Sequence, residues 1–382
     1  MTNFIYIDNF STTPLSPYAL SQMTGALSLT GNPASPHIAG AQALFRINEA
    51  REKIADFIGA LSSEILFTSG ATEANNLVLR GISQWGILNQ KNKKRIIISE
   101  IEHKSVLETA ISLRNVGFDV VKAPVLCDGT IDLAQFDELI NDQTLLVSLM
   151  CVNNETGVIQ PVRDAVKMAH KHGALFHCDA AQALGKLSID VLELGVDYLS
   201  LSAHKCYGPM GVGALYIAAD APKPIAQNTG GGQERGLRSG TEPVPLIVGF
   251  GASAKEADRQ LEDNAVHSAR LAAHFLARLD SAQVKYRRIS GDAPTIPGGF
   301  ALIFPDISAD EIISKVSKVL CISTGSACNK GSVVPSYVFT SMGFSDEEAR
   351  SIIRFSFSRF NTLEESERAA LILIEAISTV RS

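Results

Sequence analysis

The feature that most constrains the fold is a regular alternation of short apolar runs and amphipathic stretches along the middle of the chain. The apolar runs are bounded by Gly, Asn and Pro, and they predict buried strands at 64–67, 95–99, 145–152, 174–179, 197–202 and 213–217. Helical patterns lie between them, at 72–84, 104–116, 132–140 and 162–172. Such alternation is typical of an α/β fold with a mostly parallel, doubly wound sheet. Ligands of such sheets bind beyond the carboxyl ends of the strands.

A segment of different character follows this alternation. It begins with a long helical pattern from about residue 246 and includes a strand candidate at 352–358, where alternation puts Arg354 on the polar face. This C-terminal part, joined by the N-terminal dozen residues, is predicted to form a second, smaller α+β domain. The predicted limits are 14–263 for the large domain, 1–13 and 264–382 for the small one, and about 323–335 for a mobile loop within it.

The composition excludes several classes of protein. Hydrophobic residues make up 46% of the 382 residues and charged residues 19%, which suits a large core rather than a disordered chain. The net charge of −6 argues against direct binding of nucleic acid. No apolar run reaches the roughly 18 residues of a membrane span, and no signal peptide is visible. Six cysteines without a CxxC pair predict neither a disulfide framework nor a zinc site, so we expect a cytoplasmic protein without a bound metal.

A candidate anion site follows the first predicted strand. The sequence there reads Thr-Ser-Gly-Ala-Thr-Glu at 68–73, with a glycine just before a helix begins. The glycine lets the backbone approach a ligand, and the free amides of Ala71 and Thr72 favour an anion such as one phosphate group. An ordinary capped helix start is the alternative. The chain has neither a Walker A loop nor a GxGxxG fingerprint here, which argues against a nucleotide.

Two further strand ends carry groups that suit one cofactor. Asp179 can pair with a protonated ring nitrogen or, alternatively, cap the next helix, and Gln182 can bond a ring oxygen. Lys205 lies in an apolar loop bounded by Gly and Pro, where desolvation favours the neutral amine and a Schiff base with an aldehyde. A surface lysine is the alternative. Ser202 and His204 add two phosphate donors beside this amine.

Together these groups suit pyridoxal 5′-phosphate, which a lysine holds covalently and a carboxylate at its pyridinium nitrogen makes electron-withdrawing. His103 follows the strand predicted at 95–99 and could stack on the ring and move protons. A lone histidine is more often structural, but this one belongs to the same row of loops. Cys206 is interpreted as a packing residue.

The order of these motifs resembles that of the cysteine desulfurases, which belong to the class V aminotransferase group of fold type I pyridoxal-phosphate enzymes. The resemblance runs over nearly the whole chain, from the Tyr-Ile-Asp at 6–8 to the Arg-Phe-Ser at 354–356. Between these ends, the matching stretches are SGATE at 69–73, EH at 102–103, NNETG at 153–157, DAAQ at 179–182, SAHK at 202–205 and GGGQERGLRSGT at 230–241.

The resemblance implies a role for each residue around the ring. Lys205 would hold the cofactor and act as the base, Asp179 would pair with the pyridine nitrogen, and Gln182 with the ring hydroxyl. His103 would stack on the ring and shuttle protons. Asn154 would touch both cofactor and substrate.

The resemblance also implies which residues would bind the cofactor phosphate and the substrate carboxylate. Arg354 would grip the carboxylate through two parallel hydrogen bonds. Thr241 would reach the phosphate of a partner subunit, which implies an obligate homodimer. The residues that would hold the phosphate within one subunit are Ala71, Thr72, Ser202 and His204.

Cys328 distinguishes the desulfurases from other class V enzymes, because sulfur transfer requires a thiol. It lies in the Gly/Ser-rich stretch at 323–332, which resembles the mobile loop of the long-loop desulfurases. Its thiolate would attack the sulfur of L-cysteine, leaving L-alanine and a persulfide on Cys328. An incidental exposed cysteine is the alternative, although exposed thiols are a liability.

Other functions remain open at this stage. Selenocysteine lysis, transamination by another class V enzyme, and a non-catalytic scaffold that binds partners are the alternatives to desulfuration. The sulfur acceptor is expected to be a protein. Relatives that deliver sulfur to iron–sulfur scaffold proteins often extend past their last helix, whereas this sequence stops at Ser382. Iron–sulfur cluster assembly and a thiolation pathway are therefore both possible destinations of the sulfur.

Overall fold

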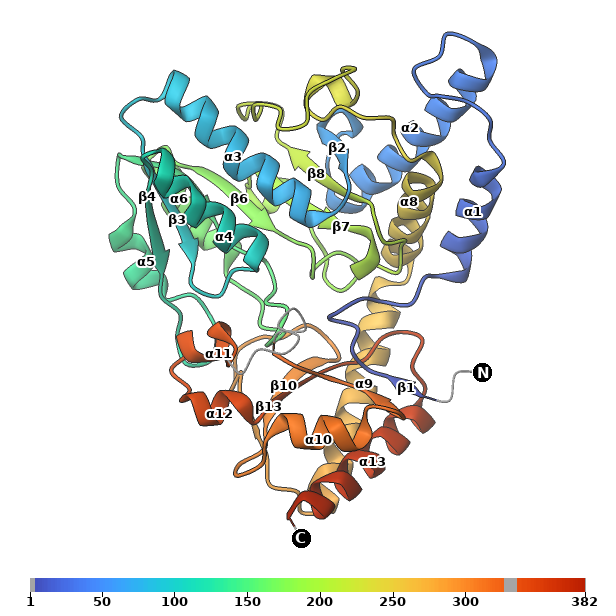
Figure 1. Cartoon of the computed structure of the whole chain (residues 1–382), viewed down its shortest axis with the longest axis vertical. Helices are drawn as coiled ribbons and strands as arrows, with labels where there is room; N and C mark the ends of the chain where they lie inside the picture. Colours follow the sequence, from blue (N-terminus) through green and yellow to red (C-terminus); the bar gives the residue numbers. More distant parts are fainter. Residues whose placement is uncertain (1–3, 326–334, 382) are drawn as a thin grey trace.

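The computed structural model describes residues 4–325 and 335–381 (Figure 1). Its largest sheet has seven strands in the order β2-β8-β7-β6-β5-β3-β4. β8 runs antiparallel to both neighbours, whereas the other neighbouring pairs are parallel. The strands are β2 (Ile65–Thr68), β3 (Arg95–Ser99), β4 (Asp119–Ala123), β5 (Thr144–Ser148), β6 (Leu175–Asp179), β7 (Tyr198–Ser202) and β8 (Gly213–Ile217). This confirms the predicted α/β fold class.

The two faces of this sheet are covered by separate layers of buried residues, as a doubly wound sheet requires. Because side chains alternate along β3, Ile97 packs into one layer and Ile96 and Ile98 into the other. One layer is completed by α3 (Ala71–Asn89) and α4 (Lys104–Leu113). The opposite layer includes residues of α2 (Ile38–Ile58), α6 (Val162–Lys171) and α8 (Val244–Arg259).

The remaining helices of this part are shorter or lie at its edge. α2 and α8 pack closely, since a side chain at Gly251 would lie 2.6 Å from the Cα of Ala50. The long helix predicted from about 246 is interrupted at Gln260, which separates α8 from α9. The bounds are α1 (Pro17–Leu27), α5 (Leu133–Leu139) and α7 (Val191–Leu194), whereas α9 (Leu261–Ser281) packs into the second core.

A second core lies below the large sheet in Figure 1. It is built around a four-stranded sheet in the order β12-β13-β10-β9 and a cluster of stacked and tilted rings that includes Phe275, Phe300 and Phe355. Its elements are β9 (Arg287–Arg288), β10 (Gly299–Ile303), α10 (Ala309–Val316), β12 (Ser323–Thr324), α11 (Tyr337–Ser341), α12 (Asp346–Arg350), β13 (Ile352–Ser356) and α13 (Leu363–Arg381).

The N-terminal segment packs on this second core. β1 (Ile5–Tyr6) pairs in parallel with β11 (Leu320–Cys321), and Ile5 and Ile7 are buried in the same cluster as Phe300. On this basis we propose the division into a large domain at 14–263 and a small domain at 1–13 and 264–382. Among the described residues, no helix has both the length and the hydropathy to span a bilayer.

Capping boxes precede two helices of the second core. At α12, the Ser345 hydroxyl accepts from the Glu348 amide while the Glu348 carboxylate accepts from the Ser345 amide. Thr362 and Glu365 make the same reciprocal pair before α13. The loop predicted at about 323–335 starts later than expected, because Ser323 and Thr324 form β12 against β13. Residues 326–334, including Cys328, lie outside the described residues.

Candidate active site

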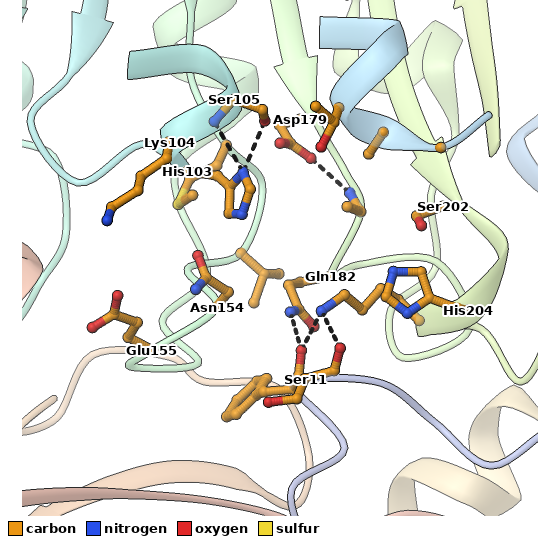
Figure 2. Close-up of a pocket in the computed structure, with 18 of the residues that line it drawn as sticks. Ser11, His103, Lys104, Ser105, Asn154, Glu155, Asp179, Gln182, Ser202 and His204 are labelled. Atoms are coloured by element: carbon orange, nitrogen blue, oxygen red, sulfur yellow. Dashed lines mark hydrogen bonds between the residues drawn. The ribbon is translucent and has the colours of Figure 1, made fainter. Parts of the chain in front are cut away.

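A cavity of about 490 Å³ lies where β6 and β7 end, facing the N-terminal segment and β13. This volume is in the range of small-molecule sites. Figure 2 shows His103 and Asp179 on one side of it and Gln182 and Ser11 on the other. The candidate residues that line it are Ala71, Thr72, His103, Asn154, Asp179, Gln182, Ser202, His204, Lys205 and Arg354.

Two candidates are not part of this lining as described. Thr241 is exposed at the surface and is not among the residues that line the cavity. Its expected contact is with a partner subunit, so that prediction stays untested. Cys328 belongs to the residues outside the described part of the chain.

The start of α3 offers backbone amides to the cavity. Gly70 precedes the helix with φ near +152°, a conformation that favours glycine, and has no side chain to cap the helix. Gly213 on β8 lets it come close, since a Cβ at Gly213 would lie 2.6 Å from the Cα of Gly70. The amides of Ala71 and Thr72 have no hydrogen-bond partner among the described residues. This geometry suits an anion at a helix N-terminus.

Asp179 presents its carboxylate at the end of β6. Asn75 Nδ2 on α3 donates to one oxygen at 2.7 Å, and the Ala181 amide donates to the other at 3.0 Å. Asp179 therefore caps a turn, not a helix, and two donors hold the carboxylate in place. The Asn75 contact was not foreseen from the sequence.

The amine of Lys205 is held by backbone oxygens of the N-terminal segment. Lys205 ends the short helix η3 (Ala203–Lys205) after β7. Its Nζ donates to the carbonyls of Phe10 and Ser11, the latter at 2.8 Å. Gln182 Nε2 also donates to the Phe10 carbonyl, at 2.8 Å. The Phe10 carbonyl thus joins the amine of Lys205 to the amide of Gln182.

The two histidines of the cavity are electrostatically similar. Burial lowers the pKa of His103, with Asp179 opposing that shift, while Lys205 adds to it. His103 Nδ1 accepts from the Ser105 amide at 3.2 Å, so a neutral ring carries its proton on Nε2. Burial, followed by Lys205, lowers the pKa of His204 to about 4. Both rings are therefore neutral near pH 7.

Arg354 is almost fully buried, and its guanidinium is held from several sides. Nη2 donates to Asp8 Oδ1 at 2.9 Å and to Ser11 Oγ at 2.6 Å, and Nη1 donates to the Asn154 carbonyl at 2.9 Å. Nε has no partner among the described residues. Within the described part of the chain, Nη1 makes only one of its two hydrogen bonds, and Arg354 lines the cavity, so its guanidinium suits a carboxylate ligand.

Glu155 also lines the cavity, although no role was predicted for it. It is fully buried, and Ser336 Oγ donates to its Oε2 at 2.5 Å. Burial raises the pKa of Glu155, while the Ser336 bond and the charge of Arg354 oppose that shift. A side chain at Gly325 would collide with the same oxygen. Across residues 4–325 and 335–381, no group of three or more His, Cys, Asp or Glu could hold a metal ion.

The geometry agrees with comparisons to known proteins. The sequence profile described as aminotransferase class-V matches residues 5–368. Since this range covers nearly the whole chain, the chain belongs to the class V aminotransferase family. The family resemblance expected from the motif order is thereby confirmed.

The curated relatives identify the branch of that family. "Cysteine desulfurase IscS" of Rickettsia bellii is 42% identical over 385 residues, covering 99% of this chain and 92% of the relative. "Cysteine desulfurase, mitochondrial" of Drosophila melanogaster is 41% identical, covering 99% of this chain and 81% of the relative.

Solved structures are similar over comparable lengths. A NifS-like protein superimposes with a TM-score of 0.91 at 35% identity, covering 98% of this chain and 100% of that one. A structure of SspA in complex with cysteine has a TM-score of 0.82 at 38% identity, covering 94% of this chain and 100% of that one.

Proposed function

We propose that the chain is a pyridoxal-phosphate-dependent cysteine desulfurase, which converts L-cysteine to L-alanine and transfers the sulfur through a persulfide on Cys328. The observation that carries this proposal is one cavity that joins the amine of Lys205, the held carboxylate of Asp179 and the buried guanidinium of Arg354. The relatives that match 99% of this chain are named cysteine desulfurases. This favours desulfuration over transamination, selenocysteine lysis and a non-catalytic scaffold.

The donor set of the cavity fits pyridoxal 5′-phosphate. The unpartnered amides of Ala71 and Thr72, with Ser202 and His204 nearby, form a cradle for a phosphate. Asp179 offers an acceptor to a protonated ring nitrogen. Lys205 offers the amine that binds an aldehyde, so each functional group of this cofactor has a counterpart in the cavity.

The chain's own residues then divide the work. When bound, the cofactor supplies an electron sink that makes the α-carbon proton of its amino acid acidic. Lys205 Nζ, oriented by the carbonyls of Phe10 and Ser11, takes up that proton. Neutral His103, with its proton on Nε2, can donate that proton and take up another.

The substrate is bound and attacked by two further residues. Arg354 holds the carboxylate of L-cysteine, and the cysteine complex of the SspA structure supports this substrate class. The Cys328 thiolate forms a bond to the substrate sulfur while the bond from that sulfur to the β-carbon breaks. The electron pair remains with the carbon skeleton, which takes up protons to become alanine, so no external oxidant or reductant is consumed.

A homodimer belongs to the same proposal. α1 and α2 carry exposed apolar side chains, including Leu27 at 66%, Ile38 at 77% and Phe45 at 62% exposed. Large apolar side chains left exposed on two helices suit an interaction face, and a second copy related by twofold symmetry would cover them. Thr241, which is exposed, would then reach the phosphate of the neighbouring cavity. The sulfur acceptor is proposed to be a carrier protein of iron–sulfur assembly or of a thiolation pathway.

The test is mass spectrometry of the Cys328 peptide after incubation of the holoenzyme with L-cysteine. We expect the added mass of one sulfur atom on that peptide, together with alanine in solution. C328S should retain the visible absorbance of the cofactor but form no persulfide. C127S, which removes an exposed thiol, is the matched control and should behave as wild type. Persulfide formation at full rate in C328S would refute the proposal.

A second variant tests the cofactor site. K205A should lose the visible absorbance of the bound cofactor and slow alanine formation by about 10³-fold or more. K223A is the control, because Lys223 Nζ donates to the Ala218 carbonyl at an exposed position away from the cavity. An unchanged absorption spectrum in K205A would show that another amine holds the cofactor.

A further inference from the structure

Lys186 lies directly behind the cavity and belongs to no step described so far. It follows β6 in the turn that carries Gln182, and its Nζ donates to Gln182 Oε1 at 2.7 Å. Its Nζ also lies 5.7 Å from the centre of the Phe10 ring. Phe10 thus contacts Lys186 through its ring and accepts from Gln182 and Lys205 through its carbonyl.

These partners determine the orientation of the Gln182 side-chain amide, that is, the positions of its oxygen and nitrogen. A protonated lysine has only donors, so the atom of Gln182 that faces Lys186 must be the oxygen. The Phe10 carbonyl has only acceptors, so the atom that faces it must be the nitrogen. One N–H of Gln182 is used by Phe10, and the second remains for the cavity that Gln182 lines.

The charge on Lys186 has no acidic partner. Among the residues that the structure describes, no carboxylate lies within ion-pair distance of it. Burial, followed by the charge of Lys205, lowers the pKa of Lys186 to about 7. Its neighbour Cys206 is neutral, because burial raises the pKa of that thiol to about 12. An unpaired cation this close to the cavity polarises the groups between them.

A second, much smaller cavity of about 20 Å³ adjoins Lys186. Lys186 lines it together with Asn9 and Asn264. Asn9 Oδ1 and Asn264 Nδ2 have no partner in the described part of the chain. A cavity of this size has room for about one water molecule, and these unpartnered polar atoms favour its binding there. Such a water would hydrate the ammonium group and so favour its protonated form against the effect of burial.

We propose that Lys186 is a positioning residue that holds Gln182 as a hydrogen-bond donor toward the ring oxygen of the cofactor and, through the polarised amide, favours the unprotonated form of the cofactor–lysine adduct. This inference rests on the proposed function. Lys186 does not touch the reacting atoms itself, and its effect passes through the amide of Gln182.

The experiment is a pH titration of the visible absorption of the holoenzyme. The charged and titratable groups near Lys205 and Gln182 are Lys186 on the same turn, Asp179 on β6, His204 on η3, His103 at the start of α4 and Arg354 on β13. All of them except Lys186 are retained in K186M. We expect the midpoint of that variant to move by about 0.5–1 unit to higher pH and cofactor affinity to fall about fivefold.

Matched variants separate positioning from a general structural effect. K186R keeps the charge and the donors, so its midpoint should stay close to that of wild type, whereas K167M removes an exposed lysine and should leave the midpoint unchanged. Where K186M does not fold, K186Q gives the same comparison. In a Q182L background, K186M should shift the midpoint by less than half as much, because the route through the amide is gone.

The outcomes are distinguishable. A wild-type protein with a titrating band and a K186M protein with the same midpoint would overturn the inference and leave the proposed function intact. An equal shift in the wild-type and Q182L backgrounds would also overturn it, because Lys186 would then act independently of Gln182. A wild-type protein that shows no visible band with pyridoxal phosphate would overturn both.

Discussion

The two walls of the cavity are built in different ways. The sheet wall, formed by His103, Asp179 and Lys205, consists of side chains that follow strand ends. Its supporting bonds are often local, such as that from the Ser105 amide to His103, two residues away. The N-terminal wall, formed by Phe10, Ser11 and Arg354 and supported by Asp8, depends on distant partners. Arg354 and Asp8 are 346 residues apart in the sequence, and Lys205 and Ser11 are 194 apart.

This difference suggests a division of labour. The sheet wall holds the groups proposed to bind the cofactor, and it is fixed by the folding of the large sheet. The N-terminal wall holds the guanidinium proposed to bind the substrate carboxylate, and it forms only when the chain ends have packed on the second core. Damage to the N-terminal wall should therefore impair substrate binding more than cofactor binding.

The largest effect is expected from D8N. Asp8 and Arg354 form an ion pair with side chains only 12% and 3% exposed, so this variant leaves a buried cation without its counter-charge. Removing one partner of a buried pair costs about 3–5 kcal/mol. We expect that loss in urea unfolding, a rise in KM for L-cysteine of about tenfold or more, and a much smaller change in cofactor affinity.

The control for D8N is the same substitution in an exposed ion pair. Asp164 and Lys167 are both more than half exposed, so D164N should cost less than about 1 kcal/mol. If D8N weakened cofactor and substrate binding equally, the two walls would not be energetically separate.

A smaller effect, on the pH dependence of stability, is expected from His177 in the large sheet next to the sheet wall. His177 on β6 is fully buried between the hydroxyls of Ser148 and Ser200, at 2.7 and 2.9 Å. Burial lowers its pKa from 6.5 to about 4. Between these values the unfolded chain binds more protons, so the free energy of unfolding falls as the pH decreases, by up to about 3 kcal/mol. Below pH 4 this contribution is constant.

H177Q should flatten this dependence in urea unfolding measured from pH 7.5 to pH 4.5. His170 provides a control of opposite sign, because its hydrogen bond to Asp197 raises its pKa. Its contribution is present at low pH and is lost as the pH rises, so H170Q should steepen the acid loss. An H177Q protein with the full wild-type slope would show that other groups cause the acid sensitivity.

The sheet wall was predictable because each of its parts lies within a short sequence window. A strand, a glycine or lysine at its end, and a helix start occupy about ten consecutive residues, so Ala71 and Lys205 could be assigned from local patterns. β3 and β8 have the predicted bounds, whereas β5 ends earlier than expected. β4 was missed because it lies at the edge of the sheet and only Val120 and Ala123 are buried, so it lacks the continuous apolar run of a central strand.

The N-terminal wall was only partly predictable. Arg354 was identified from its alternation along one strand and from the family resemblance, but its partner Asp8 gave no local signal. The carbonyls of Phe10 and Ser11 could not be assigned at all, because every residue has a carbonyl and only the tertiary fold selects these two. The contact of Lys186 with Gln182 was not predicted, because a spacing of four residues brings side chains together on a helix, whereas these residues lie in turns.

The smallest effect is expected from E155Q, which asks how many negative charges surround Arg354. Burial raises the pKa of Glu155, so the folded state binds its proton more tightly than the unfolded state. Stability is then lost as the pH rises from 4.5 through the folded pKa, and Gln removes that loss while it can still accept from Ser336. In urea unfolding, E155Q should match wild type at acid pH and be equally or slightly more stable at pH 8, by less than about 1 kcal/mol.

E348Q is the control of opposite sign, because a hydrogen bond from the Ser345 amide lowers the pKa of that carboxyl. If E155Q were instead less stable at pH 8, Glu155 would be an ionised second partner of Arg354, and the N-terminal wall would bind its cation with two carboxylates rather than with Asp8 alone.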